Sequence, residues 1–515
     1  MTYRITSTAS RRALLAGAAS LVIGIAVASP GMATESTRKG VLKYATLGLD
    51  TSDPHRHTGS IAVQQAYVEA LTSIAANGAV EPFLAESFDV SPDGLVYTFK
   101  LRPNVKFHND DVMTAADVAA NFERVKSKVK GGWLVTAMKL VTAIETPDDR
   151  TVVVRLSAPY SPFLNLLSEL WILSPKSEGW DETIKTPLGT GPFTFGTWQP
   201  KVKLTAPAFA DYWKSGQPKV KQVEFNLRDD SDKSLALRAG DLHIISVERD
   251  EVETLKGAGA AEITVLKDTT WYSIAFNNRK PRKPFDDIRV RQALALAVDK
   301  AAFMKFVGGD KGVVTNQIVA PGNVYFDQAF HDADGFKKAD LDTAKRLLAE
   351  AGVNPVEHTI EFVSWQDAYA QVVVQMVRKL GFKVNHVALD DIGAQKRLGQ
   401  YDWDMNAMGS GPRSDIFLRF VRLMSDGPNP TLWGGIQDSE LDNLIEAGVQ
   451  EPDAAKRKAK YLEAMKRIEA KGYFYVLGHA PSLIAVRRGV SGYEPGFTWA
   501  SHWASGGIAQ TSVSP

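Results

Sequence analysis

The stretch Ser91–Val125, SPDGLVYTFKLRPNVKFHNDDVMTAADVAANFERV, has the clearest order of local structure in the chain. It opens with Ser-Pro-Asp-Gly, which is typical of a tight turn because proline presets φ and glycine tolerates positive φ. Leu95–Leu101 then alternates apolar and polar side chains, which predicts a half-buried strand. Val105–His108 predicts a second short extended run.

A capped helix closes the same stretch. Thr114 and Asp117 have the spacing of a capping box, in which a threonine side chain and an acid three residues later each bond the other's backbone N–H. Val118, Phe122 and Val125 follow at helical spacing. The predicted order is turn, strand, extended run and helix, and it contains no arrangement typical of catalysis.

This stretch resembles the signature of the family 5 solute-binding proteins of ABC importers, which include dipeptide, oligopeptide, nickel and glutathione binders. The matching positions are Asp93-Gly94, Tyr97–Phe99, Leu101-Arg102, Val105–His108 and Thr114–Val118, whereas Asp110 stands where the family has glycine. The resemblance extends from about Leu42 to Leu483 through further motifs at Leu188–Phe193, Ala210–Lys214, Gly240–Ile244 and Pro284–Ala293.

The resemblance implies an α/β fold of the periplasmic binding protein type, with two α/β lobes joined by a hinge and a smaller extra lobe. A chain of 515 residues is long enough for two or three such lobes. The expected boundaries are residues 34–78, 187–268 and 480–515 for lobe I, 79–186 for the small lobe II, and 269–479 for lobe III.

Several elements are predicted from the residues themselves. His358–Val363, Ala368–Leu380 and Lys383–Leu389 alternate as strand, helix and strand, which predicts a βαβ unit and a parallel sheet. A helix is expected over Ile61–Leu71. Separate strands are expected at Ile263–Lys267, Trp271–Asn277 and Tyr473–Leu477, with the tail from Gly489 returning to lobe I.

Composition and charge exclude several classes of protein. The chain is 44% hydrophobic and 23% charged, with a net charge of +1 and no cysteine. A net charge this small gives no support for nucleic-acid binding. Without cysteine, the chain has no disulfide, no thiolate metal site and no lipoprotein anchor.

The first 33 residues predict an export signal peptide. Ser10-Arg-Arg12 precedes an apolar run from Ala13 to Ala28, and Gly31-Met-Ala33 resembles a small-residue cleavage site. The paired arginines favour a twin-arginine signal, with a Sec-type signal as the alternative. Removal of residues 1–33 would leave 57 basic and 59 acidic residues. We therefore expect a soluble protein exported to the periplasm.

The sequence contains no HExxH, GxSxG, Walker A or CxxC motif. His55 and His57 lie two apart, which allows either a metal pair or a solvated turn, and the lack of a third ligand at metal spacing favours the turn. Adjacent acids such as Asp286-Asp287 are typical of turns and helix starts rather than of a catalytic pair. No cofactor, no metal and no enzymatic activity are expected, and a hydrolase remains only a remote alternative.

The resemblance places the ligand between the lobes and gives the candidate binding residues. They are Thr58, Gly59 and Ser60 on an early loop, Trp271, Tyr272 and Trp403 as aromatic walls, and Ser410, Gly411, Arg413 and Asp415 on a later loop. Each aromatic residue is otherwise an ordinary core residue. Peptide binders of the family place an aromatic and an early aspartate in the later loop, where this chain has Met408-Gly-Ser-Gly411.

Arg413 and Asp415 are the charged groups of that loop. An arginine offers a planar fork suited to a carboxylate or phosphate, and the alternative is that Arg413 and Asp415 pair with each other or with loop backbone. The expected function is that of a monomeric receptor for a peptide-like, opine-like or sugar-derived solute, including anionic ones. It would deliver this solute to the permease subunits of an ABC importer, and through them to the ATPase. The alternative is an exported sensor or chaperone-like protein without an importer.

Overall fold

The computed structural model describes the chain except for residues 1–37, 47–48, 57–60, 76–78, 130–131, 228–231, 248, 366–367, 412, 414, 428–429, 496–506 and 515. The expected signal peptide and the early loop of Thr58, Gly59 and Ser60 lie outside the described residues. Residues 37–515 form one compact unit, and the lobe boundaries stay a prediction. Within the described residues, no helix has the length and apolar character needed to cross a membrane.

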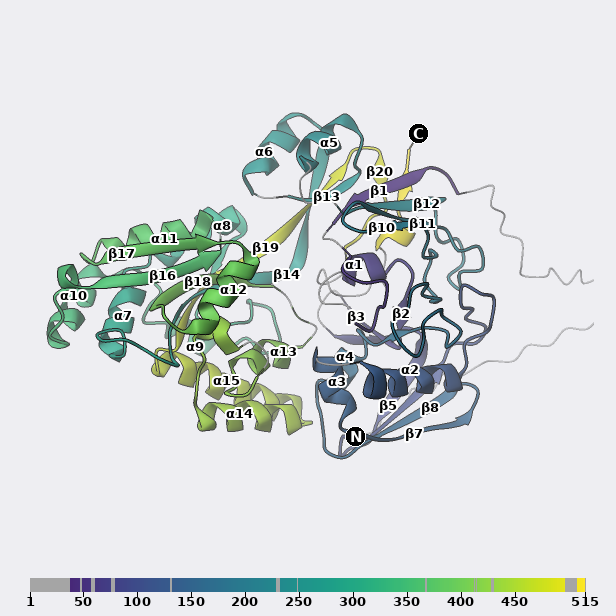
Figure 1. The fold of residues 1–515 in the computed structure, drawn as a ribbon, viewed down its shortest axis with the longest axis horizontal. Helices are drawn as coiled ribbons and strands as arrows, with labels where there is room; N and C mark the ends of the chain where they lie inside the picture. The colour runs from purple at the N-terminus through teal and green to yellow at the C-terminus, as the bar shows by residue number, and fades with distance from the viewer. Residues whose placement is uncertain are drawn as a thin grey trace, which may run out of the picture. The chain divides into compact units, whose positions relative to one another are not determined.

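A mixed sheet of eleven strands runs through this unit (Figure 1). Its first ten strands in spatial order are β10 (Trp198–Gln199), β11 (Lys203–Pro207), β12 (Gln222–Asn226), β1 (Val41–Ala45), β13 (Ile244–Val247), β19 (Phe474–Arg487), β14 (Ala261–Phe276), β18 (Met405–Ser410), β16 (Thr359–Trp365) and β17 (Lys383–Leu389). The eleventh strand, β15 (Val313–Val314), pairs with β19. The α/β fold class is confirmed.

The predicted βαβ unit is also confirmed. Strands β16 and β17 pair in parallel from Thr359↔Lys383 to Trp365↔Leu389, and α11 (Ala368–Arg378) connects them. Helix α11 buries Val373, Val374 and Val377 against the sheet. A parallel pair requires such a crossover because a tight turn cannot reverse the chain between parallel strands.

Two long antiparallel strands join the two ends of the large sheet. β14 has 16 residues and β19 has 14, and they pair from Ala261↔Arg487 to Ala275↔Phe474 with two register shifts. The prediction of separate short strands at Ile263–Lys267, Trp271–Asn277 and Tyr473–Leu477 was therefore wrong. The segments between them stay extended because each long strand pairs with the other along most of its length, and the irregularities absorb the twist.

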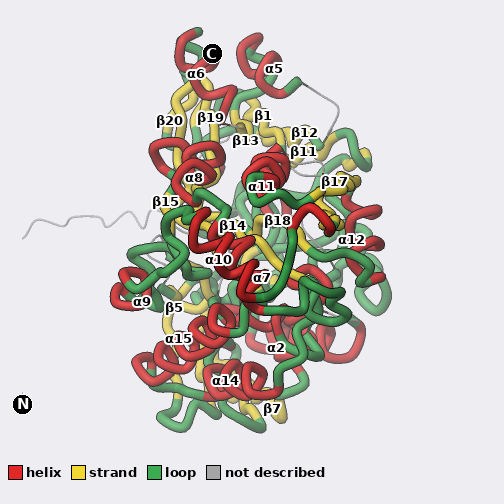
Figure 2. Tube along the Cα trace, turned by 90° about the vertical axis from the view of Figure 1, so that its left-hand side faces the viewer, coloured by secondary structure: helices red, strands yellow, loops and turns green. Residues whose placement is uncertain are grey.

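The second half of β14 carries a different core on each face. Trp271 and Ala275 pack with α13–α15 on one side, and Ile274 and Phe276 pack with α7, α8, α10 and α11 on the other. Figure 2 shows α7, α10 and α11 in front of β14 and β18. The bounds of these helices are α7 (Ile288–Leu296), α8 (Lys300–Gly308), α10 (Leu341–Glu350), α13 (Phe417–Phe420), α14 (Ser439–Gln450) and α15 (Ala454–Ala470).

The stretch Ser91–Val125 belongs to a four-stranded antiparallel sheet. Its order is β5 (Ala85–Val90), β6 (Val96–Leu101), β8 (Thr151–Leu156) and β7 (Val141–Asp148). Tyr97, Phe99 and Leu101 of β6 are buried, as alternation predicts. The capping box is confirmed at the start of α2 (Ala115–Lys128), where Thr114 N donates to Asp117 at 2.8 Å. The second extended run is reduced to a single bridge, Lys106↔Val112, because turns flank it closely.

The predicted helix over Ile61–Leu71 was wrong. α1 (Ile61–Gln64) is one turn long, and β2 (Glu69–Ala70) and β3 (Thr72–Ile74) follow it. Every residue from Val63 to Ile74 is buried, so the segment lacks the polar face of an amphipathic helix. Instead β2 pairs with β9 (Trp171–Ile172) and β3 pairs with β4 (Val80–Pro82).

The remaining elements are short. They are α3 (Gly132–Met138), α4 (Phe163–Leu166), α5 (Lys233–Ala239), α6 (Arg249–Gly257), α9 (Gln328–Asp332) and α12 (Asp391–Gln400), with the strand pair β20 (Val490–Ser491) and β21 (Ser512–Val513).

Candidate functional site

One cross-strand row brings together two of the predicted binding residues. Trp271 of β14 pairs with Ser410 of β18 on one side and with His479 of β19 on the other. Directly opposed residues of an antiparallel pair point to the same face, so the three side chains share one face of the sheet. Neighbouring strands thus place the predicted tryptophan beside the start of the predicted loop.

Trp271 is held by other aromatic rings. It is 1% exposed and stacks on Trp433 with a centroid distance of 5.7 Å and an interplanar angle of 17°. Trp433 lies in the turn Pro430–Trp433, directly before Gly434. Gly434 has a φ of +77°, and a Cβ there would lie 1.8 Å from the carbonyl oxygen of Phe276. Only glycine fits, so the backbone itself positions Trp433 against Trp271.

This face carries buried polar atoms that have no hydrogen-bond partner among the described residues. They are Trp271 Nε1, Trp433 Nε1, Ser273 Oγ and Asn406 Oδ1, and we call these four residues the unpaired patch. Ser273 and Asn406 fall on the face of Trp271 by strand alternation and register. Asn406 Nδ2 donates to the carbonyl of Leu432 at 3.1 Å, beside Trp433. A buried polar atom without a partner costs about 1–3 kcal/mol, so the patch favours contact with a polar molecule.

His479 contributes a neutral side chain to the row. Its Nε2 lies 2.9 Å from the carbonyl oxygen of Gln317, which can only accept, so Nε2 carries the proton. Nδ1 then accepts from the hydroxyl of Thr269 at 2.7 Å. Burial, and next the charge of Arg419, lower the pKa of His479 to about 3. The ring is therefore held in place by two hydrogen bonds and stays uncharged at neutral pH.

The structure separates the other two predicted aromatic residues from Trp271. Tyr272 points to the opposite face of β14, where its ring meets Phe303 at 5.8 Å and Tyr369 at 5.3 Å, edge to face. Trp403 is fully buried, and its Nε1 donates to the carbonyl of Leu398 at 3.0 Å. The core alternative for Trp403 agrees with this placement. A binding role for these residues stays a prediction.

The later loop has one acid, and that acid is bonded elsewhere. Asp415 is 6% exposed, and its Oδ1 accepts from Arg457 Nη2 at 2.7 Å and from the backbone N–H of Phe417 at 2.7 Å. Burial lowers the pKa of Arg457, but the charge of Asp415, the neighbouring tyrosines and the bond to Asp415 together raise it. Gly411 and Arg413 are partly buried, and Arg413 also has a contact of its own. The charge partner seen for Asp415 is thus Arg457, 42 residues away.

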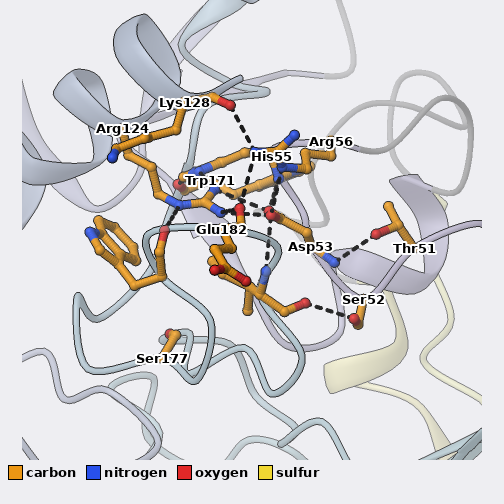
Figure 3. Close-up of polar contacts among 12 residues, drawn as sticks. Thr51, Ser52, Asp53, His55, Arg56, Arg124, Lys128, Trp171, Ser177 and Glu182 are labelled. Carbon is orange, nitrogen blue, oxygen red and sulfur yellow. Dashed lines mark hydrogen bonds and ion pairs between the residues drawn. The ribbon is translucent and has the colours of Figure 1, made fainter. Parts of the chain in front are cut away.

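A second buried polar cluster was missed by sequence reasoning (Figure 3). Asp53 is fully buried and His55 is 5% exposed, so the turn expected at His55 is present but is buried and not solvated. Arg124 of α2 binds Asp53 with both terminal nitrogens, at 2.6 and 3.1 Å, and its Nη1 lies 2.8 Å from His55 Nδ1. His55 Nε2 donates to the carbonyl of Trp171 at 2.7 Å.

The Asp53–Arg124 cluster comprises Asp53, His55 and Arg124, whose side-chain nitrogens and carboxylate oxygens all have partners among the described residues. Arg124 Nε also donates to the carbonyl of Trp180 at 2.6 Å, and the N–H of Ile184 donates to Asp53 at 3.1 Å. Burial raises the pKa of Asp53, but the bonds from Arg124 and Ile184 outweigh burial and lower it. A signal was present in the sequence, because Asn121 and Arg124 interrupt the buried face of α2. The cluster fixes the chain directly before residues 57–60.

No metal centre is formed by the described side chains. Within the described ranges, no group of three or more His, Asp or Glu residues could hold a metal ion. His57 of the expected pair lies outside the described residues, and His55 is taken up by Arg124 and Trp171.

Comparisons with known proteins give consistent matches. The family model described as "Bacterial extracellular solute-binding proteins, family 5 Middle" matches residues 79–428. "Di/tripeptide-binding protein 2" of Pseudomonas aeruginosa (strain UCBPP-PA14) is 29% identical over 93% of this chain and 95% of its own length. "Glutathione-binding protein GsiB" of Escherichia coli (strain K12) is 27% identical over 72% and 73%.

A solved structure is similar over nearly the whole chain. The PBP AgaA in complex with agropinic acid, from A. tumefacien R10, superposes with a TM-score of 0.74 at 26% identity. The match covers 92% of this chain and 99% of that one. These three relatives are binding proteins by their names.

Proposed function

Because the chain belongs to the bacterial extracellular solute-binding proteins, family 5, we propose that it is the periplasmic receptor of an ABC importer. In this proposal it captures one small polar solute between two closing lobes and delivers it to the permease subunits. Ligand binding free energy would shift the equilibrium toward the closed form. The unpaired patch carries the proposal, because it combines flat aromatic walls with buried polar atoms free for a solute.

The chemistry of the later loop favours an acid over a peptide amine. Peptide recognition by this loop would need a free carboxylate for the α-amino group, and Asp415 is bonded to Arg457 instead. A Cβ at Gly409 would lie 3.1 Å from the side chain of Thr270 and 3.2 Å from that of Tyr272, so an early aspartate there would require these side chains to shift. Arg413 offers a planar fork for a carboxylate. We therefore rank opine-like and acidic sugar-derived solutes above di- and tripeptides.

A melting-shift screen of opines, acidic sugars, peptides and metal chelates tests the proposal. A true ligand at 100 times its Kd should stabilise the protein by about 2.7 kcal/mol. A panel in which only peptides bind would contradict the ranking, and a panel in which no solute class binds would contradict the receptor function itself.

The role of Arg413 is tested by a pair of variants. Arg413→Ala should weaken an anionic solute at least tenfold, and Arg413→Lys, which keeps the charge but lacks the fork, should recover part of that loss. Affinity would be measured by isothermal titration. Unchanged affinity in Arg413→Ala would refute the role of the fork.

A further inference from the structure

A cavity of about 400 Å³ lies where the turn between β5 and β6 approaches α15. Its volume falls in the range of small-molecule sites. Its lining includes Pro92, Tyr97, Tyr160, Tyr325, Pro452 and Arg457. None of the predicted solute-binding residues that the structure describes, and none of the unpaired patch, lines it, so we treat it as a separate site.

The walls of this cavity suit a flat ring. Tyr97 and Tyr160 are 4% and 5% exposed, and Tyr325 adds a third phenol ring. Three prolines, Pro92, Pro159 and Pro452, complete the apolar lining. Tyrosine rings stack on flat groups and present a hydroxyl at one end, which makes them frequent anchors of binding sites.

Tyr160 supplies the polar contact. Its hydroxyl is buried and has no hydrogen-bond partner in the part of the chain that the structure describes, whereas that of Tyr97 reaches the carbonyl of Tyr160 at 3.4 Å. Burial raises the pKa of Tyr160, so the hydroxyl keeps its proton at neutral pH and is available as a donor. A ligand acceptor would satisfy it.

The charge in the cavity is already balanced. Arg457 is the one charged residue in the described lining, and it pairs with Asp415 at 2.7 Å, both side chains being buried. A charged ligand would lose part of its hydration against these walls without gaining a counter-ion from the described lining. The lining therefore selects an uncharged ligand.

We propose that this cavity is a second binding site, for a neutral molecule with one flat ring and a hydrogen-bond acceptor, such as an aromatic amide. The acceptor binds the hydroxyl of Tyr160, and the ring lies among the tyrosines and prolines. The site also contacts the start of α13, because Tyr160 packs edge-on against Phe417 at 5.9 Å and Arg457 holds Asp415. Ligand binding in the cavity therefore stabilises the single turn of α13.

Acetanilide is a suitable probe, titrated into the full chain without added solute and followed by ligand-observed NMR. Tyr160→Phe should weaken its binding about fivefold to tenfold, since it removes one hydrogen bond. Tyr475→Phe is the matched control, because Tyr475 also has a buried unpaired hydroxyl but does not line the cavity. It should leave binding unchanged.

Ala454→Trp tests the location independently. Ala454 lines the cavity and is exposed in the first turn of α15, so a large ring there blocks the cavity without disturbing the core. Acetanilide binding should be lost, while the melting temperature changes little. Phenylacetate, of similar size but charged, should bind wild type at least tenfold more weakly than acetanilide.

Hydrogen exchange measures the contact with α13. Saturating acetanilide should slow exchange at the Phe417 amide in wild type and leave it unchanged in Ala454→Trp. No acetanilide binding by wild type, equal binding by Ala454→Trp, or stronger binding of phenylacetate would overturn the proposal. All three readouts are independent of the importer function, so their failure is distinct from a failure of that function.

Discussion

Two buried polar clusters of this chain differ in how their hydrogen bonds are satisfied. In the Asp53–Arg124 cluster, the side-chain nitrogens of Arg124 and His55 and both carboxylate oxygens of Asp53 meet protein partners (Figure 3). In the unpaired patch, two indole N–H groups, a hydroxyl and an amide oxygen have no partner among the described residues. Both sets are buried, so exposure does not distinguish them. A cluster whose polar groups are all paired stabilises the fold, whereas a cluster with unpaired polar groups is suited to bind a ligand.

The largest expected effect comes from opening the paired cluster. Arg124→Met removes the bidentate partner of the buried Asp53 and leaves it only the longer ion pair with Arg56 at 3.3 Å, so the free energy of unfolding should fall by about 3 kcal/mol, measured in urea. The matched control is Arg155→Met, whose exposed pair with Glu145 should cost less than about 1 kcal/mol. Equal effects in the two variants would show that completeness of pairing does not mark the structural cluster.

Glu69 is an intermediate case, and it gives a pH dependence. It is fully buried and accepts from Tyr212, Trp213 and Thr190 at 2.7, 2.8 and 2.9 Å, with no salt bridge among the described residues. Burial raises its pKa from 4.5 to about 6, against the lowering effect of these bonds.

The folded protein therefore binds the Glu69 proton more tightly than the unfolded chain does. The resulting stability is fully present below pH 4.5 and is lost as pH rises through about 6, a change of about 2 kcal/mol. Glu69→Gln should remove this slope from urea unfolding curves between pH 4.5 and 7. Glu123→Gln, at an exposed position on α2, should retain it, and identical slopes in the two variants would contradict the assignment.

Two tryptophan variants compare paired and unpaired indoles directly. Trp403→Phe removes a bonded, buried Nε1, while the carbonyl of Leu398 keeps the bond from the N–H of Tyr401 at 3.2 Å, so stability should fall by about 1 kcal/mol with solute affinity unchanged. Trp433→Phe removes an unpaired Nε1, so affinity should fall about tenfold with a smaller loss of stability. Denaturation and titration of both proteins check this. If Trp433→Phe lowered stability more than affinity, the unpaired patch would stabilise the fold and not bind solute.

The smallest effect is expected at Ser273. Ser273→Ala removes a buried hydroxyl that has no protein partner, so the free energy of unfolding should stay within about 1 kcal/mol of wild type or rise. Solute affinity should fall two- to fivefold. A clear destabilisation would mean that the hydroxyl contributes to the fold and not to binding.

Much of the fold was predictable from local pattern. Alternation gave the face of β6, Thr114 and Asp117 gave the start of α2, and the strand–helix–strand rhythm gave the parallel pair β16–β17. Such features depend on residues a few positions apart, where backbone preferences and short-range bonds operate. The family resemblance rests on these same local motifs, so it indicates the class of protein without any tertiary contact.

Tertiary structure alone assigned the partners of the polar residues. Asp415 and Arg413 are two residues apart, yet the described salt bridge of Asp415 joins it to Arg457. Trp271 and Tyr272 are adjacent, yet strand alternation and register send them into different cores, and only Trp271 reaches Trp433 and Ser410. His55 was expected in a solvated turn, but α2 places Arg124 against both His55 and Asp53. A buried charge or indole takes its role from whichever distant group packing brings within hydrogen-bond reach, and no local pattern encodes that distance.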